Sequence, residues 1–453
     1  MTRDQSAREL VEAQRAYYRS GATRSYAARM AALKSLERSL MAHREEVLAA
    51  LDTDLGKPPV EAYLAEYFFI LSELRLVMKS LKKWMKPKRV SNPVYFFPTR
   101  TEERRDPFGV VGIFVPWNYP LQLALSPLVT AIAAGNCAVL KAAESAPATS
   151  ALLAKIVAEA LRAEHVTVML GEVDAAQDLL ASDLDFIFYT GSTQIGKSVG
   201  QSAASRLIPH VLELGGKCPV LVDKAVDVEG AARRVLVGKF FNGGQTCFAP
   251  DFVVVHESVK QRFVDACARL LDEIPWAAEM ACVVNQRHFE RLQGLLEEPM
   301  IQAEGAARVG GMKPTILPES SWDSKVMQEE IFGPILPVLT YREDADLVAQ
   351  LRTQGSPLAL YLFSENDAWV EARIADLPSG GVCVNDTMKQ GSHLGVAFGG
   401  VGESGYGRYR SRAGFEAFTY QRAVVKRGFK VRDMFELKPP YGDMIEKLKS
   451  LMK

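Results

Sequence analysis

The spacing of hydrophobic and polar positions predicts that the chain begins with helices. Along one early stretch, apolar side chains recur three or four positions apart with arginine and lysine between them: Tyr26, Met30, Leu33, Leu36 and Leu40. This spacing places them on one face of a helix, where they can pack against a core. We therefore expect a helical region over residues 7–85.

After Pro107 the pattern changes to short β-branched runs that alternate with helical stretches. The first series of predicted strands covers 110–115, 138–140, 166–170 and 186–189, with a helix at 150–163 among them. The second series covers 219–222, 252–255, 335–340 and 360–363. Strands that alternate with helices are typical of parallel, doubly wound sheets. The predicted fold class is therefore α/β, with two doubly wound α/β domains.

Three prolines, Pro87, Pro93 and Pro98, interrupt the chain between the helical region and the first strands. The apolar residues 94–97 suit an extended strand better than a helix. We expect this stretch to form one strand of a small protruding sheet, with the basic, aromatic stretch 418–431 paired against it. An exposed strand that is apolar on one side favours pairing with a second copy of the chain.

The composition limits the possible partners and the compartment. The 453 residues include 54 basic and 54 acidic side chains, so no net charge attracts nucleic acid or an anionic membrane. The six cysteines and six histidines have no metal-ligand spacing, which favours a reducing cytoplasm and no structural zinc. The N-terminus lacks the apolar core of a secretory signal, and the longest apolar run, 121–134, is too short to span a bilayer.

Two glycine-containing motifs carry candidate chemistry. Cys247 ends the sequence Asn-Gly-Gly-Gln-Thr-Cys, and Glu213 lies earlier in Leu-Glu-Leu-Gly-Gly-Lys. A thiolate can attack a carbonyl, a carboxylate can activate water, and glycines let backbone amides and a substrate approach closely. Each motif also has a purely structural interpretation, because a lone cysteine is commonly a small buried residue and Gly-Gly after a strand is commonly a turn.

Five segments, taken in order, resemble the aldehyde dehydrogenase superfamily. They are Pro-Trp-Asn-Tyr-Pro at 116–120, the Glu213 and Cys247 motifs, Glu-Ile-Phe-Gly-Pro at 330–334 and Phe-Gly-Gly-Val-Gly at 398–402. Five motifs in one order are far more specific than a single glycine pattern. The short N-terminus and the Gly-Gln-Thr-Cys spelling are most similar to the class 3 branch, which acts on fatty and aromatic aldehydes.

The resemblance implies a division of the chain. The NAD-binding domain would comprise 1–86 and 104–213, and the catalytic domain 214–410. The remaining segments, 87–103 and 411–453, would form the oligomerisation arm and the C-terminal tail. The class 3 resemblance also implies a homodimer.

The resemblance assigns three catalytic residues. Cys247 would attack the aldehyde to give a thiohemiacetal, which becomes a thioester on loss of hydride. The side-chain amide of Asn118 and the backbone NH of Cys247 would form an oxyanion hole, although asparagine before Tyr-Pro is also frequent in turns. Glu213 would activate the water that hydrolyses the thioester. Branches that use coenzyme A commonly lack this glutamate, so its presence favours release of a free acid.

The resemblance also implies an NAD site, with NADP possible. Gly191 and Ser192 would contact the pyrophosphate, because their loop follows a strand and opens a helix, although such turns are commonly only structural. The other implied cofactor contacts are Trp117, Lys141, Glu144, Glu330 and Phe332. Glu144 would bind ribose hydroxyls and repel a 2′-phosphate, which favours NAD.

Tyr119 and Leu123, one helical turn apart, are expected to face the substrate tunnel together. No arginine or lysine accompanies them, so we expect medium or long aliphatic, or aromatic, aldehydes in preference to charged semialdehydes. The loop 387–397 would line the entrance, where the role of His393 is open. Two alternatives remain: a dehydrogenase that transfers the acyl group to coenzyme A, and a binding protein that keeps the fold without catalysis.

Overall fold

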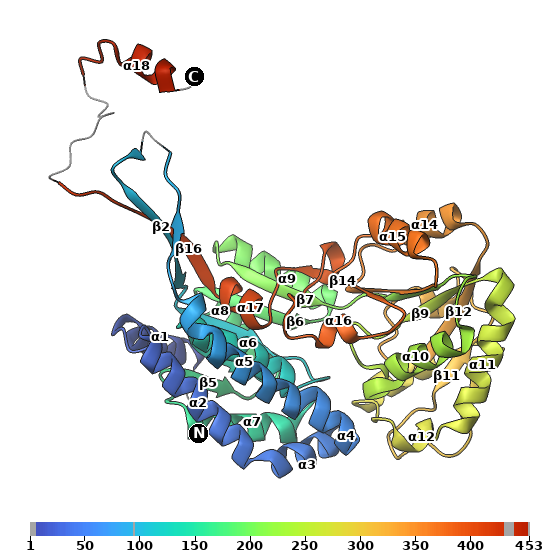
Figure 1. Cartoon of the computed structure of the whole chain (residues 1–453). Helices are drawn as coiled ribbons and strands as arrows, with labels where there is room; N and C mark the ends of the chain where they lie inside the picture. Colours follow the sequence, from blue (N-terminus) through green and yellow to red (C-terminus); the bar gives the residue numbers. More distant parts are fainter. Residues whose placement is uncertain (1–5, 94–95, 430–438, 452–453) are drawn as a thin grey trace.

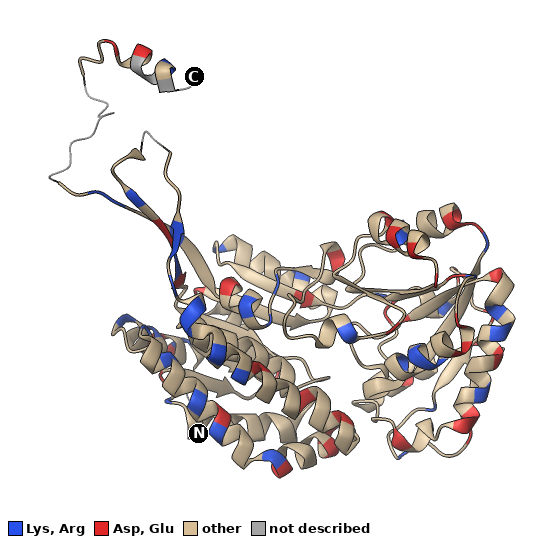
Figure 2. Ribbon diagram, viewed as in Figure 1, with Lys and Arg blue, Asp and Glu red and all other residues tan. Residues whose placement is uncertain are grey.

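Three sheets organise the chain in the computed structural model, which describes residues 6–93, 96–429 and 439–451. Two of them, with six and seven strands, are the centres of two α/β layered units that lie side by side (Figure 1). The third has three strands and projects from the first unit as an arm. The predicted α/β fold class with two wound sheets is confirmed. In the view of Figure 2, basic and acidic residues are interspersed over both units.

The six-stranded sheet has the order β15-β7-β6-β3-β4-β5. Its strands are β3 (Val110–Phe114), β4 (Cys137–Lys141), β5 (Val166–Met169), β6 (Phe186–Gly191), β7 (His210–Leu214) and β15 (Gly405–Tyr406). All neighbours are parallel except β15, which pairs antiparallel with β7. The connecting helices are α6 (Gln122–Ala134), α7 (Pro147–Ala160), α8 (Val173–Ala181) and α9 (Thr193–Ser205). The predicted strands match these bounds to within two residues.

The seven-stranded sheet has the order β10-β11-β12-β9-β8-β13-β14. Its strands are β8 (Pro219–Val222), β9 (Phe252–His256), β10 (Ile301–Gln302), β11 (Thr315–Leu317), β12 (Ile335–Tyr341), β13 (Ala359–Phe363) and β14 (Gly381–Val384). Only the β10–β11 pair is antiparallel. The helices are α10 (Val228–Phe240), α11 (Lys260–Glu273), α12 (Trp276–Glu279), α13 (Gln286–Gln293), α14 (Asp344–Arg352), α15 (Asp367–Asp376) and α16 (Lys389–Ser392). Short 3₁₀ turns lie at Phe241–Gly244, Glu257–Val259, Lys325–Met327 and Gly402–Ser404.

Helices begin the chain, as the apolar spacing predicts. They are α1 (Ala7–Arg19), α2 (Tyr26–Ala42), α3 (Arg44–Leu55), α4 (Pro59–Glu61), a π-helix (Ala62–Phe68) and α5 (Phe69–Trp84). Leu33, Leu36 and Leu40 are fully buried, whereas Tyr26 at the start of α2 is exposed. Helices α2 and α3 pack on α7, and α5 packs on α6, so the first sheet is covered by a helical layer.

The arm consists of β1 (Lys88–Val90), β2 (Arg100–Pro107) and β16 (Thr419–Lys426). Strand β16 pairs antiparallel with the whole of β2, as expected, over residues 419–426 of the stretch 418–431. Residues 427–429 lie beyond the strand, and 430 and 431 lie outside the described residues. The strand expected at 94–97 is wrong for Phe96 and Phe97, which lie in the turn between β1 and β2, while 94 and 95 lie outside the described residues. Pro98 and a hydrogen bond from the Thr99 amide to the Phe96 carbonyl, 2.8 Å long, favour a turn there.

Helix α17 (Ser411–Ala417) leads into β16, and α18 (Met444–Leu451) lies beyond the end of the arm (Figure 1). Within the described part of the chain, no helix is long and apolar enough to cross a membrane. The same residues contain no group of three or more His, Cys, Asp or Glu side chains placed to hold a metal ion.

Candidate active site

Two cavities adjoin the same two loops between the sheets. One, of about 680 Å³, is lined by Asn118, Glu213 and Cys247 together. The other, of about 770 Å³, is lined by Tyr119 and Phe248, the residues that directly follow Asn118 and Cys247 in the chain. Consecutive residues of each loop thus line different cavities, and the three predicted catalytic side chains share one of them.

The loop that carries Cys247 follows α10 through a tight turn. Asn242, Gly243 and Gly244 all have positive φ, at 54°, 61° and 73°. A side chain at Gly244 would collide with the backbone carbonyl of Gly333, so glycine is required there. Asn242 is not a glycine, yet it adopts the left-handed backbone conformation. Such strained residues commonly occur at functional sites, where the surrounding structure holds them in place.

Burial, together with the nearby Glu330 and Glu213, raises the pKa of Cys247 to about 12, while Arg410 acts in the opposite direction. Without a bound ligand the residue is therefore a thiol at neutral pH. The neighbouring Cys218 is buried and donates its S–H to the Cys247 carbonyl at 3.6 Å, so it supports the loop.

Asn118 follows β3, in the bend before α6, and is 4% exposed. Its side-chain Nδ2 donates to the carbonyl of Gln245 at 3.0 Å, two residues before Cys247. Asn242 Nδ2 donates back to the Asn118 carbonyl at 3.1 Å. These two bonds fix the asparagine bend against the cysteine loop, although the two come from different units of the fold.

Glu213 lies in β7 and is 3% exposed. Neither carboxylate oxygen has a hydrogen-bond partner in the described part of the chain. Burial raises the pKa of Glu213 well above its ordinary value, with Arg410 and Arg408 acting in the opposite direction. Gly399 leaves space for the carboxylate, because a Cβ there would lie 2.8 Å from Oε1. A buried, unpartnered carboxyl group in a cavity is a candidate proton acceptor.

Five of the seven expected cofactor residues line the 680 Å³ cavity: Trp117, Gly191, Ser192, Glu330 and Phe332. Ser192 caps the start of α9, the position from which helix amides can face an anion. Lys141 and Glu144 do not line this cavity. Instead Lys141, at the end of β4, donates to Glu144 at 3.0 Å.

Glu330 lies beside Gly215, where any side chain would collide with its carboxylate. Burial and the neighbouring Asp251 raise the pKa of Glu330 to about 8. Lys217 holds the segment before Glu330, because its Nζ donates to the carbonyls of Val326 and Glu329, both at 2.9 Å. Asp251 in turn accepts a hydrogen bond from the backbone amide of Ile331, which follows Glu330, at 3.0 Å.

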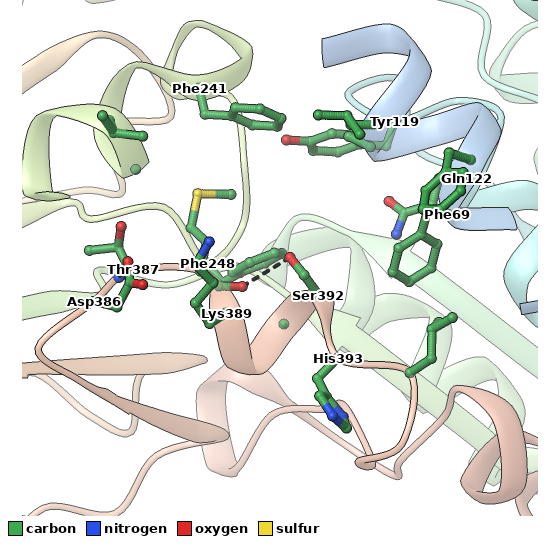
Figure 3. A pocket seen from close by; sticks show the side chains of 18 of the residues that line it. Phe69, Tyr119, Gln122, Phe241, Phe248, Asp386, Thr387, Lys389, Ser392 and His393 are labelled. Atoms are coloured by element: carbon green, nitrogen blue, oxygen red, sulfur yellow. Dashed lines mark hydrogen bonds between the residues drawn. The ribbon is translucent and has the colours of Figure 1, made fainter. Parts of the chain in front are cut away.

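The 770 Å³ cavity is mainly apolar, with Phe69, Tyr119, Phe241 and Phe248 around it (Figure 3). The expectation that Leu123 shares it with Tyr119 is wrong, because Leu123 lines the other cavity. The Leu123 amide donates to the Tyr119 carbonyl at 2.9 Å, so the two residues are one helical turn apart, but their side chains line different cavities. His393 lines the apolar cavity from the loop predicted to form its entrance.

The expectation that no basic side chain accompanies this cavity is also wrong. Arg233 and Arg234 of α10 and Lys389 of α16 line it, together with Asp386. All three basic residues are solvent-exposed, which places their charges toward water. They lie more than a hundred positions from Tyr119 in the sequence, so a search confined to the neighbours of Asn118 does not find them.

A family model described as "Aldehyde dehydrogenase family" matches residues 1–424. The chain is 37% identical to the 4,4'-diaponeurosporen-aldehyde dehydrogenase of Staphylococcus aureus, with 97% of each chain covered. It is 38% identical to aldehyde dehydrogenase family 3 member B1 of Mus musculus, with 94% of this chain and 92% of the relative covered.

Solved structures agree with this match. The substrate-bound state of AldH from Staphylococcus aureus superposes with a TM-score of 0.95 at 36% identity, covering 98% of this chain and 99% of that one. An NAD+ complex of an aldehyde dehydrogenase from Bacillus cereus superposes with a TM-score of 0.84 at 26% identity, covering 93% and 89%. The chain therefore belongs to the aldehyde dehydrogenase family, and the relatives it resembles include class 3 members.

Proposed function

We propose that the protein oxidises apolar aldehydes to carboxylic acids through a thioester on Cys247, with NAD as hydride acceptor and NADP as a possible substitute. The observation that carries this proposal is the shared cavity of Cys247, Asn118 and Glu213, next to a second, apolar cavity. In the net reaction an aldehyde, NAD+ and water become a carboxylate, NADH and two protons.

The residues of the 680 Å³ cavity fit a dinucleotide. The start of the 13-residue helix α9, capped by Ser192, offers backbone amides to a pyrophosphate. The partly buried Glu330 can bind a ribose hydroxyl, and the rings of Trp117 and Phe332, with centroids 5.4 Å apart, form an apolar wall. Bound there, the nicotinamide would supply hydride acceptance. Lys141 and Glu144 keep a proposed role toward the adenosine ribose, where Glu144 disfavours a 2′-phosphate.

Three side chains would divide the acyl chemistry. Cys247 loses its thiol proton to water and, as the thiolate, forms a C–S bond to the aldehyde carbon, while the carbonyl oxygen gains negative charge. Asn118 Nδ2 and the amide of Cys247 would donate to that oxygen. After hydride loss, Glu213 takes a proton from water as the water attacks the thioester carbon and the C–S bond breaks. Its carboxylate is free to do so because no protein group within the described residues donates to it.

The aromatic lining of the 770 Å³ cavity supports an apolar substrate chain. The exposed basic residues at the same cavity require a direct comparison with charged substrates. We expect hexanal, decanal and benzaldehyde to have higher kcat/KM values than succinic semialdehyde, and a clear preference for the semialdehyde would overturn the assignment.

Incubation with NAD and an aldehyde panel tests the activity itself, with NADH absorbance as the readout. The wild type should reduce NAD, and Cys247→Ala should bind NAD without reducing it. If the wild type forms no NADH with any aliphatic or aromatic aldehyde, the proposal is refuted. Product formation that depends on coenzyme A would instead support an acylating dehydrogenase.

We also propose the domain assignment given by the resemblance, a homodimer formed through the arm, and a cytoplasmic location. β16 is eight residues long, and among the described residues it pairs with β2 on one side and with no strand on the other, which supports the arm as an interface. Sedimentation showing only monomer at micromolar concentration would contradict the dimer.

A further inference from the structure

A fully buried ion pair lies directly behind the Asn118 and Cys247 loops. Lys57 and Glu66 form it, and both side chains have no solvent exposure. Lys57 follows α3 and Glu66 lies in the π-helix, so both belong to the N-terminal helices. Removing two charges from water is costly unless their remaining hydrogen bonds are satisfied, so the other partners of the pair indicate its function.

The lysine points at the bend that carries Asn118. Lys57 Nζ donates to the Asn118 carbonyl at 3.1 Å and lies 4.3 Å from the centre of the Tyr119 ring. The Tyr119 hydroxyl in turn hydrogen-bonds Thr246 at 2.6 Å, next to Cys247. The Lys57 ammonium group therefore contacts both Asn118 and Tyr119, and Tyr119 in turn hydrogen-bonds the cysteine loop.

The glutamate holds the same bend from its other end. Glu66 Oε2 accepts from the amides of Leu121 and Gln122, at 2.9 and 3.1 Å. These are amides at the start of α6, which has no side-chain cap of its own. The carboxylate thus caps the helix whose first turn follows Asn118.

A second carboxylate from the same helices contacts the cysteine loop directly. Glu61 accepts from the amide of Asn242 at 2.9 Å. Asn242 Nδ2 donates to the Asn118 carbonyl and also to the Gln245 carbonyl, both at 3.1 Å. The Asn118 carbonyl therefore receives one donor from the N-terminal helices and one from the cysteine loop.

We propose that Lys57, paired with Glu66 and assisted by Glu61, is a positioning residue that sets the Asn118 amide against Cys247. This inference rests on the proposed roles of Asn118 and Cys247. The network fixes the backbone of Asn118 from both sides and leaves its side chain directed at the cysteine loop. Lys57 itself touches neither substrate nor cofactor.

The test uses the double variant Lys57→Met/Glu66→Gln, which removes both charges together and leaves no unpaired ion. Methionine keeps the unbranched stem, and the glutamine oxygen can still accept from the amides of Leu121 and Gln122. The matched control is Arg29→Met. Arg29 is also buried and donates to the Ala133 carbonyl at 2.9 Å, at the opposite end of α6.

We expect kcat for decanal oxidation to fall about 10- to 100-fold in the double variant, because small misplacement of a catalytic group has effects of this size. KM for NAD should stay within about twofold, since the hydrogen bonds of the network are made to Asn118, Leu121, Gln122 and Asn242 and not to the residues proposed to hold the cofactor. Amide hydrogen exchange should speed up in 118–122 and 242–247. Arg29→Met should lower thermal stability while leaving kcat and those amides unchanged.

An unchanged kcat in the double variant, with an active wild type, would overturn the positioning role. So would equal losses of kcat in the double variant and in Arg29→Met, because they would reflect general destabilisation. If the wild type itself fails to oxidise aldehydes, the proposed function falls. Hydrogen exchange then still decides the inference, because unchanged exchange in both segments would contradict it.

Discussion

Replacement of Glu213 by glutamine separates the two halves of the proposed reaction. Both carboxylate oxygens lack hydrogen-bond partners within the described chain, so the substitution removes proton acceptance without breaking a bond present in the free protein. General base catalysis contributes about 10²- to 10⁴-fold to a rate. At about 1.4 kcal/mol per tenfold, hydrolysis of the thioester should lose roughly 3–5 kcal/mol of transition-state stabilisation.

Stopped-flow measurement of NADH formation with decanal follows both the hydride transfer and the hydrolysis of the thioester. The first turnover should still give a burst approaching one NADH per active site, because Glu213 acts only after hydride transfer. Steady turnover should then fall about 100-fold or more. In the wild type, the raised pKa of Glu213 predicts that turnover increases as pH rises and the carboxyl group ionises.

Thermal unfolding provides the control for this variant. The introduced amide replaces a buried carboxyl group that already lacks a hydrogen-bond partner in the described chain, so Tm should change by a few degrees at most. A steady rate equal to that of the wild type would refute the role of Glu213. Loss of the burst together with steady turnover would place Glu213 before hydride transfer instead.

Three further predictions concern stability, the cofactor and the substrate. Burial raises the pKa of Glu61 from 4.5 to about 7. The folded protein therefore holds this proton more tightly than the unfolded chain, and the free energy of unfolding falls by up to about 3 kcal/mol as pH rises from 4.5 through 7, at 1.36 kcal/mol per pKa unit. Glu61→Gln cannot ionise, so its Tm relative to the wild type should increase between pH 5 and pH 9, and a constant difference would contradict the assignment. Glu144→Gln should raise the ratio of NADP to NAD kcat/KM because it removes repulsion of a 2′-phosphate, whereas an unchanged ratio would count against its place near the ribose. For straight-chain aldehydes, each methylene buried in the 770 Å³ cavity should raise kcat/KM by up to about fourfold, from about 0.8 kcal/mol each; a flat series from hexanal to decanal would show that the chain lies elsewhere.

Eight strands of the two large sheets could be predicted because buried parallel strands read as β-branched runs that local pattern alone reveals. Strands β7, β10, β11, β14 and β15 were not predicted. The three catalytic candidates could be predicted from motif order, and the structure brings Cys247, Asn118 and Glu213 to one cavity. Helical spacing predicts that Tyr119 and Leu123 face the same cavity, but two cavities adjoin this turn and each side chain lines a different one, which spacing along the sequence cannot reveal.

Lys57 and Glu66 could not be found from the sequence. Their pairing depends on the packing of the N-terminal helices against a bend some sixty positions later, and no local pattern marks a lysine before two prolines as buried. Phe332 is a similar case, because its φ of 52° is a conformation that local propensity disfavours for an aromatic residue. Buried charges and backbone conformations that the local sequence disfavours concentrate at functional sites, where tertiary contacts hold them in place.

A covalent acyl group on Cys247 is the central prediction, and mass spectrometry measures it directly. Glu213→Gln protein would be mixed with NAD and decanal, quenched in acid within the burst, and digested. The peptide that contains Cys247 should carry a decanoyl group that is absent without NAD and absent in Cys247→Ala/Glu213→Gln. An active enzyme with no adduct on Cys247, or with the acyl group on another residue such as Cys218, would contradict the proposed mechanism.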